Sequence, residues 1–153
     1  MIVPTTDVAL LTRLHTECFS DAWSADSFAA LLGNAGCFAL IDAEQRGFIL
    51  IQVVADQSEV LSLGVTPAAR RRGIASQLLS EGLKQAGKRD ALTMFLEVDC
   101  RNLPAIALYK ALGFVEMGRR KAYYTTPDGG RSDALTLRTD IRVLLVGNDV
   151  QLG

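Results

Sequence analysis

Apolar residues near the start of the chain are spaced as helix faces, and those that follow are spaced as strands. One set recurs every three or four positions: Val8, Leu11, Leu14 and Cys18. Because Thr6-Asp7 can cap its start, this set predicts a helix. A second, shorter helix begins at Ser24, runs through Phe28, and ends at Gly33-Asn34. Three strand-like runs come next: Cys37–Asp42, Gly47–Ala55 and Glu59–Val65. The short polar turns between these runs predict an antiparallel meander.

The second half of the chain alternates between helix-like and strand-like segments. After Pro67, a buried helix stripe that ends at Gly87 is predicted from Ile74, Leu78, Leu79, Leu83 and Ala86. The apolar run Ala91–Val98 suits a central strand. Asn102 can cap the next helix, which Gly113 stops, and its apolar face comprises Ala105, Ile106, Leu108 and Leu112. Two last runs predict a hairpin across residues 127–130: Phe114–Thr125 and Asp133–Leu137.

These elements predict one α/β domain built on a mixed central sheet. The sheet is antiparallel at both ends, helical crossovers surround the Ala91–Val98 strand, and about four helices flank it. A chain of 153 residues has room for one such domain. We expect this domain to span residues 1–138 and to leave a tail, 139–153, of uncertain structure. An apolar patch in that tail, residues 143–146, fits a strand, a packing segment or a disordered end equally well.

Composition and charge narrow the classes of function. The chain is 49% hydrophobic and 22% charged, which is typical of a globular protein, and its net charge of −1 argues against a basic nucleic-acid-binding domain. Its apolar runs are too short to cross a bilayer, and its N-terminus lacks the pattern of a signal peptide. We therefore expect a cytoplasmic protein, a monomer or weak dimer, with no membrane partner and no direct nucleic-acid recognition.

Cysteine and histidine usage argues against a metal site. The chain has three widely spaced cysteines and a single histidine, His15, so a zinc site has almost no ligands. We expect no metal and reduced cysteines. His15 lies within a helical pattern with no nucleophile signature nearby, which also argues against a Ser-His-Asp triad.

The segment between the Glu59–Val65 run and the following helix carries the clearest chemical signal. Gly73 and Ala75 open that helix directly after Arg70-Arg71-Arg72. Small residues let a backbone approach a ligand closely, and the free N–H groups of a helix N-terminus attract anionic oxygens. Taken alone, this segment fits two interpretations equally well: a pyrophosphate site, or a basic turn exposed to solvent.

A second segment supports the pyrophosphate interpretation. Arg70, Gly73 and Ala75 match the Gln/Arg-x-x-Gly-x-Gly/Ala pattern of the GCN5-related N-acetyltransferases. Leu96-Glu97-Val98, Asn102 and the run 105–114 resemble the second half of the acyl-CoA site in that superfamily. The resemblance covers about residues 1–138 and implies the mixed-sheet acyl-CoA N-acyltransferase fold, with acetyl-CoA as the cosubstrate.

Within that superfamily the sequence is most similar to the RimI-type enzymes, which acetylate the N-terminal alanine of a small-subunit ribosomal protein. The likeness rests on Asp21-Ala22-Trp23-Ser24, Leu96-Glu97-Val98, Asn102, residues 105–109 and Tyr123-Tyr124. It differs in having Ala75 where a glycine is frequent, Arg101 before the asparagine, and a longer tail. The resemblance implies a protein or peptide N-terminus as partner, a ribosomal protein among the candidates.

The resemblance also implies roles for individual residues. Glu97 would be the base and Tyr109 the acid, and the acyl-CoA would be held by Leu63, Gly64, Val65, Arg71, Arg72, Gly73, Ile74, Ala75, Ser76 and Asn102. A carboxylate in an otherwise apolar strand is expected to be shielded from water, which suits a base. The backbone N–H of Val65 is our candidate oxyanion donor. Ordinary packing remains open for Tyr109, and a solvent-facing carboxylate for Glu97.

Three aromatic side chains are candidates for an acceptor groove. Trp23, Tyr123 and Tyr124 lie on predicted loops or strand ends beside the site, where aromatic residues suit a peptide N-terminus. Core packing is an equal alternative for Trp23. The basic run Arg119-Arg120-Lys121 fits a solvated strand edge, or a surface that steers the protein towards an acidic partner.

Three functions agree with these features. The first is direct acetyl transfer from acetyl-CoA to a protein N-terminus in a ternary complex, without an acyl-enzyme on Cys100, which has no histidine partner in sequence. The second is acetylation of a small amine, because a fold does not set the acceptor. The third is a non-catalytic acyl-CoA-binding module.

Overall fold

Seven strands form a single sheet in the computed structural model, which describes residues 1–141. Their order is β1-β2-β3-β4-β5-β7-β6. The strands are β1 (Ile2–Thr5), β2 (Cys37–Asp42), β3 (Gly47–Val54), β4 (Gln57–Val65), β5 (Thr93–Asp99), β6 (Val115–Thr125) and β7 (Arg131–Asp140). The helices are α1 (Val8–Cys18), α2 (Ala25–Leu32), α3 (Ile74–Lys88) and α4 (Leu103–Ala111), with a short 3-10 turn, η1 (Pro67–Ala69). The mixed α/β fold and the final hairpin agree with the prediction from the sequence.

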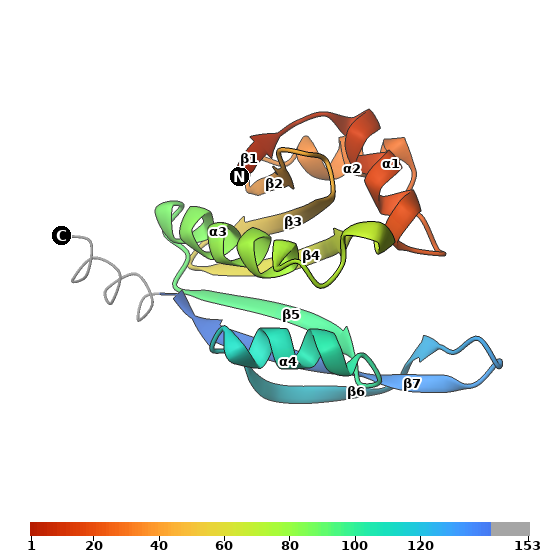
Figure 1. The fold of residues 1–153 in the computed structure, drawn as a ribbon. Helices are drawn as coiled ribbons and strands as arrows, with labels where there is room; N and C mark the ends of the chain where they lie inside the picture. The colour runs from red at the N-terminus through yellow and green to blue at the C-terminus, as the bar shows by residue number, and fades with distance from the viewer. Residues whose placement is uncertain (142–153) are drawn as a thin grey trace.

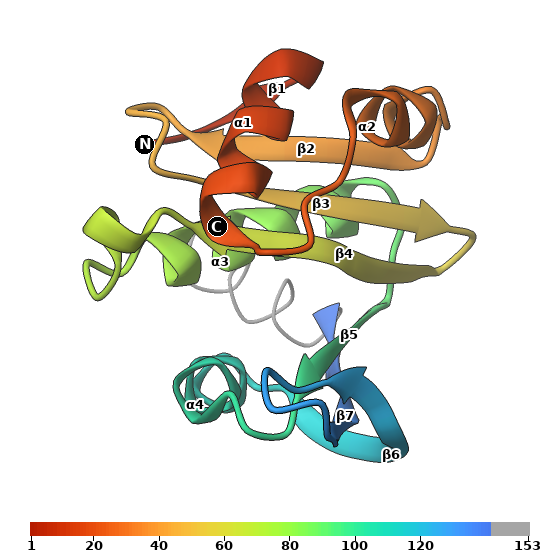
Figure 2. The ribbon, with the colours of Figure 1, turned by 90° about the vertical axis from the view of Figure 1, so that its right-hand side faces the viewer.

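Side chains of the sheet are divided between two cores because successive residues of a strand point to opposite faces. One core joins α3 and α4 to the sheet through residues such as Ile49, Leu78 and Leu96. The other packs α1 and α2 onto β2 and β3 through Leu14, Phe28 and Phe48, among others. Figures 1 and 2 show α1 and α2 over the first strands only. The corresponding face of β5 and β7 has no covering helix among residues 1–141.

Several elements differ from the sequence prediction in their presence or bounds. Strand β1, four residues including Pro4, has no counterpart in the prediction; it pairs with β2 at the sheet edge, where a proline is tolerated. Helix α3 continues through Gly87, and the chain reverses instead at Asp90, whose φ is +71°. Strand β5 begins at Thr93, not at Ala91, and β7 extends beyond the predicted Asp133–Leu137 at both ends. The apolar patch at 143–146 lies outside the described residues.

Strands β4 and β5 pair in parallel over only three positions before they separate. Their register joins Gln57 to Thr93, Ser58 to Met94 and Glu59 to Phe95. Figure 1 shows the two strands meeting at one end of the sheet and diverging towards the N-termini of α3 and α4. The facing edges of residues 60–65 and 96–99 are therefore not joined to each other, which leaves backbone groups available between them.

Candidate functional site

The edge of β4 that faces β5 carries unpaired backbone N–H groups. The Thr66 N–H donates to the Arg46 carbonyl at 2.8 Å, so Thr66 and Arg46 form a hydrogen-bonded pair of the β3–β4 ladder. Such pairs alternate in antiparallel strands, so Gly64 also bonds to β3 while Leu63 and Val65 turn their N–H groups towards β5. The Val65 carbonyl already accepts a hydrogen bond from Arg70 at 3.1 Å. An extended amide-bearing ligand would find donors along this edge.

The loop before α3 leaves the N-terminus of that helix open. Gly73 is its N-cap residue at φ +77°, and it provides no side-chain cap for the first turn. The first intrahelical hydrogen bond runs from Gln77 to Gly73 at 3.1 Å, so the N–H groups of Ile74, Ala75 and Ser76 have no acceptor within the helix. A Cβ placed on Gly73 would meet nothing within 4 Å. This open helix end is therefore a suitable anion site.

Three neighbouring arginines take different positions around that helix end. Arg71 and Arg72 are exposed. Arg71 has a φ of +67°, an unusual backbone conformation for a residue with a side chain. Arg70 instead closes the loop onto β4 through its bond to Val65. Two arginines are thus free to face an anion, and the helix dipole adds to their charge. The residues predicted to hold a pyrophosphate, 71–76, all lie at this one place.

Glu97 lies on the part of the sheet over β5 and β7 that no helix of residues 1–141 covers. Burial alternates along β5, where Met94, Leu96 and Val98 pack into the core and the residues between them face the other side. The Glu97 side chain is 25% exposed, so the expected burial is only partial. One oxygen of its carboxylate lies 3.4 Å from the Nε of Arg120 on β6. The Arg120 guanidinium also lies 5.0 Å from the centre of the Tyr123 ring.

A shallow cavity of about 320 Å³ adjoins Glu97 on this face. Its lining comes from β3, β4, β5 and β7: Gln52, Val54, Gln57, Ser58, Glu59, Phe95, Leu96, Glu97 and Thr136. The cavity combines amides, an aromatic ring and two carboxylates at the point where β4 and β5 begin to separate. It offers a small polar acceptor a place beside Glu97.

Two tyrosines have raised pKa values: Tyr124, which interacts with Glu97, and Tyr109, which interacts with Tyr124. Burial, reinforced by the negative charge of Glu97, raises the pKa of Tyr124 to about 12. Burial likewise raises the pKa of Tyr109 to about 12, with Tyr124 as the second cause. Both phenols are therefore protonated at neutral pH. Tyr109 also packs in the core with its ring 5.9 Å from that of Phe114, and its hydroxyl has no hydrogen-bond partner within residues 1–141.

Asn102 connects α4 to the open end between β4 and β5. Its side-chain oxygen caps α4 by accepting from the Ala105 N–H at 3.3 Å, as the sequence predicts, and its amide nitrogen remains exposed. Arg101, just before it, is bound to Asp99 at 2.7 Å. That ion pair lowers the pKa of Asp99 to about 2, helped by the Ser132 hydroxyl, which donates to Asp99 at 2.9 Å.

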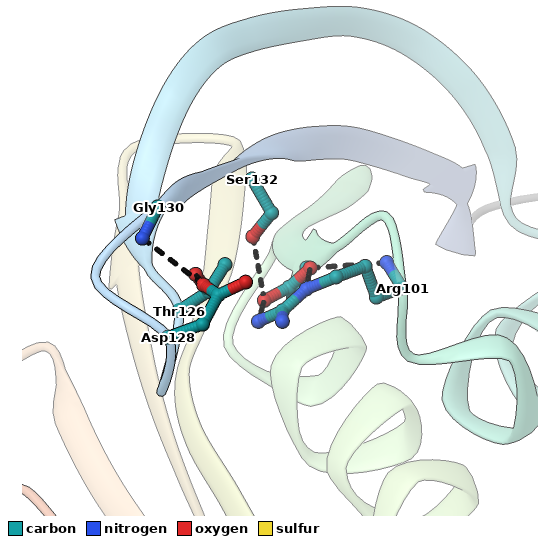
Figure 3. A network of polar contacts seen from close by, with 6 residues as sticks. Arg101, Thr126, Asp128, Gly130 and Ser132 are labelled. Carbon is teal, nitrogen blue, oxygen red and sulfur yellow. Dashed lines mark hydrogen bonds and ion pairs between the residues drawn. The ribbon is translucent and has the colours of Figure 1, made fainter.

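The loop between β5 and α4 is thereby fixed to the last hairpin. Arg101 and the Ser132 hydroxyl both donate to the Asp99 carboxylate. Figure 3 shows Arg101 and Ser132 beside the hairpin turn, in which Asp128 accepts from Thr126 and from the Gly130 N–H. Because its guanidinium is held by Asp99, Arg101 supports the shape of this end of the site.

Trp23 belongs to a different cluster, in the loop between α1 and α2. Its ring stacks on His15 at 4.9 Å and lies 5.4 Å from Phe28. Tyr123 and Tyr124 form an edge-to-face pair at 5.0 Å on β6. The structure thus groups Glu97 with Tyr123 and Tyr124, and Tyr109 adjoins this group through Tyr124. Trp23 stands over the first half of the sheet.

Several residues around the site were missed by sequence reasoning. Arg120, part of a basic run interpreted as a strand edge, contacts Glu97, and its neighbour Arg119 pairs with Asp133 at 2.9 Å. Gln52 and Glu59 of the cavity carry no local motif. Only the strand register places these residues together. No group of three potential metal ligands occurs within residues 1–141, and no helix there is long and apolar enough to cross a membrane.

Comparison with known proteins agrees with this geometry. Residues 8–114 match the model of the Acetyltransferase (GNAT) family, and the chain belongs to that family. The [ribosomal protein bS18]-alanine N-acetyltransferase of Escherichia coli K12 is 34% identical over 139 residues, which cover 90% of this chain and 93% of that protein.

Solved structures show the same fold. The crystal structure of the Escherichia coli ribosomal-protein-S18-alanine N-acetyltransferase superposes with a TM-score of 0.83 at 32% identity, over 92% of this chain and 93% of that one. Arabidopsis thaliana NAA60 in complex with acetyl-CoA superposes with a TM-score of 0.78 over 93% of this chain and 98% of that one. At 22% identity the second likeness concerns the fold.

Proposed function

We propose that this protein transfers the acetyl group of acetyl-CoA to the N-terminal α-amine of a protein, with the N-terminal alanine of a ribosomal protein as its acceptor. The observation that carries the proposal is the open region between β4 and β5, which ends at Glu97 and is flanked by the N-terminus of α3. The similarity to the Escherichia coli bS18-alanine N-acetyltransferase supports this choice of acceptor.

The residues at this site fit acetyl-CoA as a bound substrate. The N–H groups of Ile74, Ala75 and Ser76 would hold the pyrophosphate, with Arg71 and Arg72 adding positive charge. Along the Leu63–Val65 edge, in which the Gly64 N–H bonds to β3, the Val65 N–H would bond an amide of the pantetheine arm, and the Asn102 amide would reach the arm from α4. The thioester would then lie near the point where β4 and β5 meet.

Transfer requires the acceptor to give up a proton. An N-terminal amine has a pKa near 8, so it is mostly protonated at neutral pH and a carboxylate within reach is an adequate base. In the proposed reaction the ammonium gives one proton to Glu97, and the neutral nitrogen then bonds to the thioester carbonyl carbon and passes its second proton to solvent. The carbon–sulfur bond then breaks and the sulfur leaves as thiolate. Arg120 would have to yield the Glu97 carboxylate to the incoming amine.

The leaving sulfur needs a donor, and Tyr109 can supply one. With a pKa of about 12 its hydroxyl stays protonated throughout the neutral range. A thiol has a pKa near 8.5, so Tyr109 would stabilise the thiolate chiefly by hydrogen bonding, with the proton restored from the medium. The Tyr109 hydroxyl, which has no hydrogen-bond partner among residues 1–141, is available for this contact.

The strand register moves the proposed oxyanion donor along β4. Because Glu59 is paired with Phe95, the position level with Glu97 is two residues further along, at Leu61. Val65 is four residues beyond that, roughly 13 Å at the rise of a strand. The carbonyl of one bound thioester cannot lie beside both the Glu97 carboxylate and the Val65 N–H. We therefore assign Val65 to the pantetheine arm and propose the Leu63 N–H, closer to Glu97, as the oxyanion donor.

Thiol release from acetyl-CoA tests the proposal directly. The purified protein is offered a short peptide with a free N-terminal alanine, the same peptide with a blocked amine, and a polyamine. We expect release only with the free peptide. Release with the polyamine alone would favour a small-amine acceptor. Acetyl-CoA binding without release to any of the three would indicate a non-catalytic module.

Replacing Tyr109 by phenylalanine should slow transfer without disturbing the fold. Loss of one donor to a developing negative charge costs on the order of 10²-fold in kcat. Because the pKa of Tyr109 lies near 12, the pH profile of kcat between pH 6 and 10 should keep its shape in the variant. Steady-state kinetics across that range would check both points. A wild-type rate, or an alkaline limb that disappears in the variant, would contradict this role.

A further inference from the structure

His15, the only histidine of the chain, occupies an unusually enclosed position at the end of α1. The residue is 3% exposed. Its ring stacks on Trp23 at 4.9 Å and lies 4.6 Å from Phe19, and it meets Phe28 of α2 and Phe48 of β3 at 5.6 Å and 5.9 Å. One imidazole thus joins α1, the following loop, α2 and the sheet.

The loop of residues 19–24 is bonded to His15 at two points. The Phe19 N–H donates to the His15 carbonyl at 2.9 Å, and the Trp23 N–H donates to the Nδ1 of the His15 ring at 3.1 Å. Ser24 then caps α2 by accepting from the Ser27 N–H. The second of these bonds requires an Nδ1 without a proton, so only the neutral imidazole, with its hydrogen on Nε2, can hold Trp23.

The surroundings of His15 favour that neutral form. Burial lowers the pKa of His15, and the negative charge of Asp21 in the same loop raises it by a smaller amount. The elements packed against the ring from α2 and β3 present uncharged phenylalanines. The imidazole is therefore neutral at pH 7 and gains a proton only below its ordinary value of 6.5.

We propose that His15 is a positioning residue for acetyl transfer: its neutral ring holds Trp23 and the 19–24 loop in the shape that binds the acceptor peptide. The inference rests on the proposed function. It adds that Trp23 and this loop, which pack over the first strands on the same sheet face to which Glu97 points, form one wall of the acceptor groove. Protonation turns Nδ1 from an acceptor into a donor, so the Trp23 N–H loses its partner and the loop loosens. The α3 end of the site does not contact His15, so acetyl-CoA binding should not follow the same change.

Trp23 is the only tryptophan of the chain, so its fluorescence reports on this contact without any acceptor present. In the wild-type protein, emission should change in one step centred below pH 6.5 as His15 gains a proton. Two variants separate the aromatic stacking of the ring, its role as a hydrogen-bond acceptor and its titration. His15→Phe keeps an aromatic stack but removes the acceptor, and His15→Asn offers an oxygen near the position of Nδ1 but does not titrate in this range. Neither variant should show the step.

Kinetics with the alanine peptide then test the link to the acceptor. We expect His15→Phe to raise KM for the peptide roughly tenfold, the loss typical of a partly buried N–H left without an acceptor, with kcat and the Kd of acetyl-CoA nearly unchanged. His15→Asn should restore most of the KM. We also expect kcat/KM of wild type, divided by kcat/KM of His15→Asn, to decrease as the pH is lowered through 6.5. Taking this ratio cancels the effect of protonation of the peptide amine, because both proteins receive the same peptide.

Each contrary result has its own meaning. Flat wild-type emission between pH 7.5 and 5 would overturn the proposal even if no peptide were acetylated, so this arm does not depend on the proposed function. An emission step with no change in KM would remove the link to the acceptor. A parallel loss of acetyl-CoA affinity would reduce His15 to a general structural role, and a failure of wild type to acetylate the peptide would count against the proposed function.

Discussion

Glu97→Gln is expected to lower kcat by about 10²–10⁴-fold, the range over which a positioned acid or base contributes to catalysis. Glutamine keeps the size of the side chain and removes the basic oxygen. The acetyl-CoA site that we propose runs along β4 and the N-terminus of α3, and Glu97 contributes no contact to it, so the Kd of acetyl-CoA should stay within about twofold of wild type. Steady-state kinetics with the alanine peptide, and calorimetric titration with acetyl-CoA, measure the two effects separately.

A matched control for this variant is Glu116→Gln. Glu116 is an exposed carboxylate on β6, and its substitution removes the same charge from the same sheet without touching the cavity. We expect near wild-type turnover. If Glu97→Gln turns over as fast as Glu116→Gln, Glu97 is not the base. If both the rate and the acetyl-CoA affinity collapse, Glu97 has a structural role instead.

Gly73→Glu should weaken acetyl-CoA binding on the order of 100-fold. Two effects add at this position. A side chain at a φ of +77° costs about 1–2 kcal/mol and shifts the N–H groups of the first turn. A carboxylate at the helix end repels a phosphate by about 1 kcal/mol or more at 4 Å. Together these costs correspond to roughly two factors of ten in Kd, which calorimetry measures directly.

Two further glycine variants separate strain from charge. Gly73→Ala has the same backbone strain without the charge, so we expect its Kd to rise by only about tenfold. Gly129→Glu is the control elsewhere in the fold, because Gly129 also has a positive φ, +84°, and open space around its Cβ position. It should bind acetyl-CoA normally. Equal affinities in all three variants would show that the pyrophosphate does not lie at the α3 N-terminus.

The local pattern of the sequence was enough to predict most elements of the fold. Helices α1 and α2 follow from apolar spacing and from caps that the structure contains, Asp7 and Ser24. Strands β2 to β4 follow from apolar runs separated by turns. Such features depend on residues a few positions apart, so they can be read without knowledge of the tertiary structure. Strand β1 was missed because a short edge strand with a proline has little local signal.

Only those residues of the candidate site that belong to a local sequence motif could be predicted. Gly73 and its neighbours carry a helix-end signal, and Asn102 both caps α4 and belongs to the resemblance. The salt bridge of Glu97 with Arg120 could not be predicted, since it depends on where β6 bends after pairing with β7. Nor could the contact between Trp23 and His15, which depends on the path of a loop.

The sequence by itself determined the order and type of most elements, the glycine at the open N-terminus of α3, and the family. Only the tertiary structure decided that β4 and β5 separate after Glu59 and Phe95, and that Glu97 points to the part of the sheet over β5 and β7 that no helix of residues 1–141 covers. It also decided that the imidazole of His15 accepts from the Trp23 N–H. The physical reason is the distance along the sequence between the residues that interact. Periodicity and capping are set between near neighbours, whereas strand register, burial and hydrogen bonding across the sheet depend on packing between distant segments.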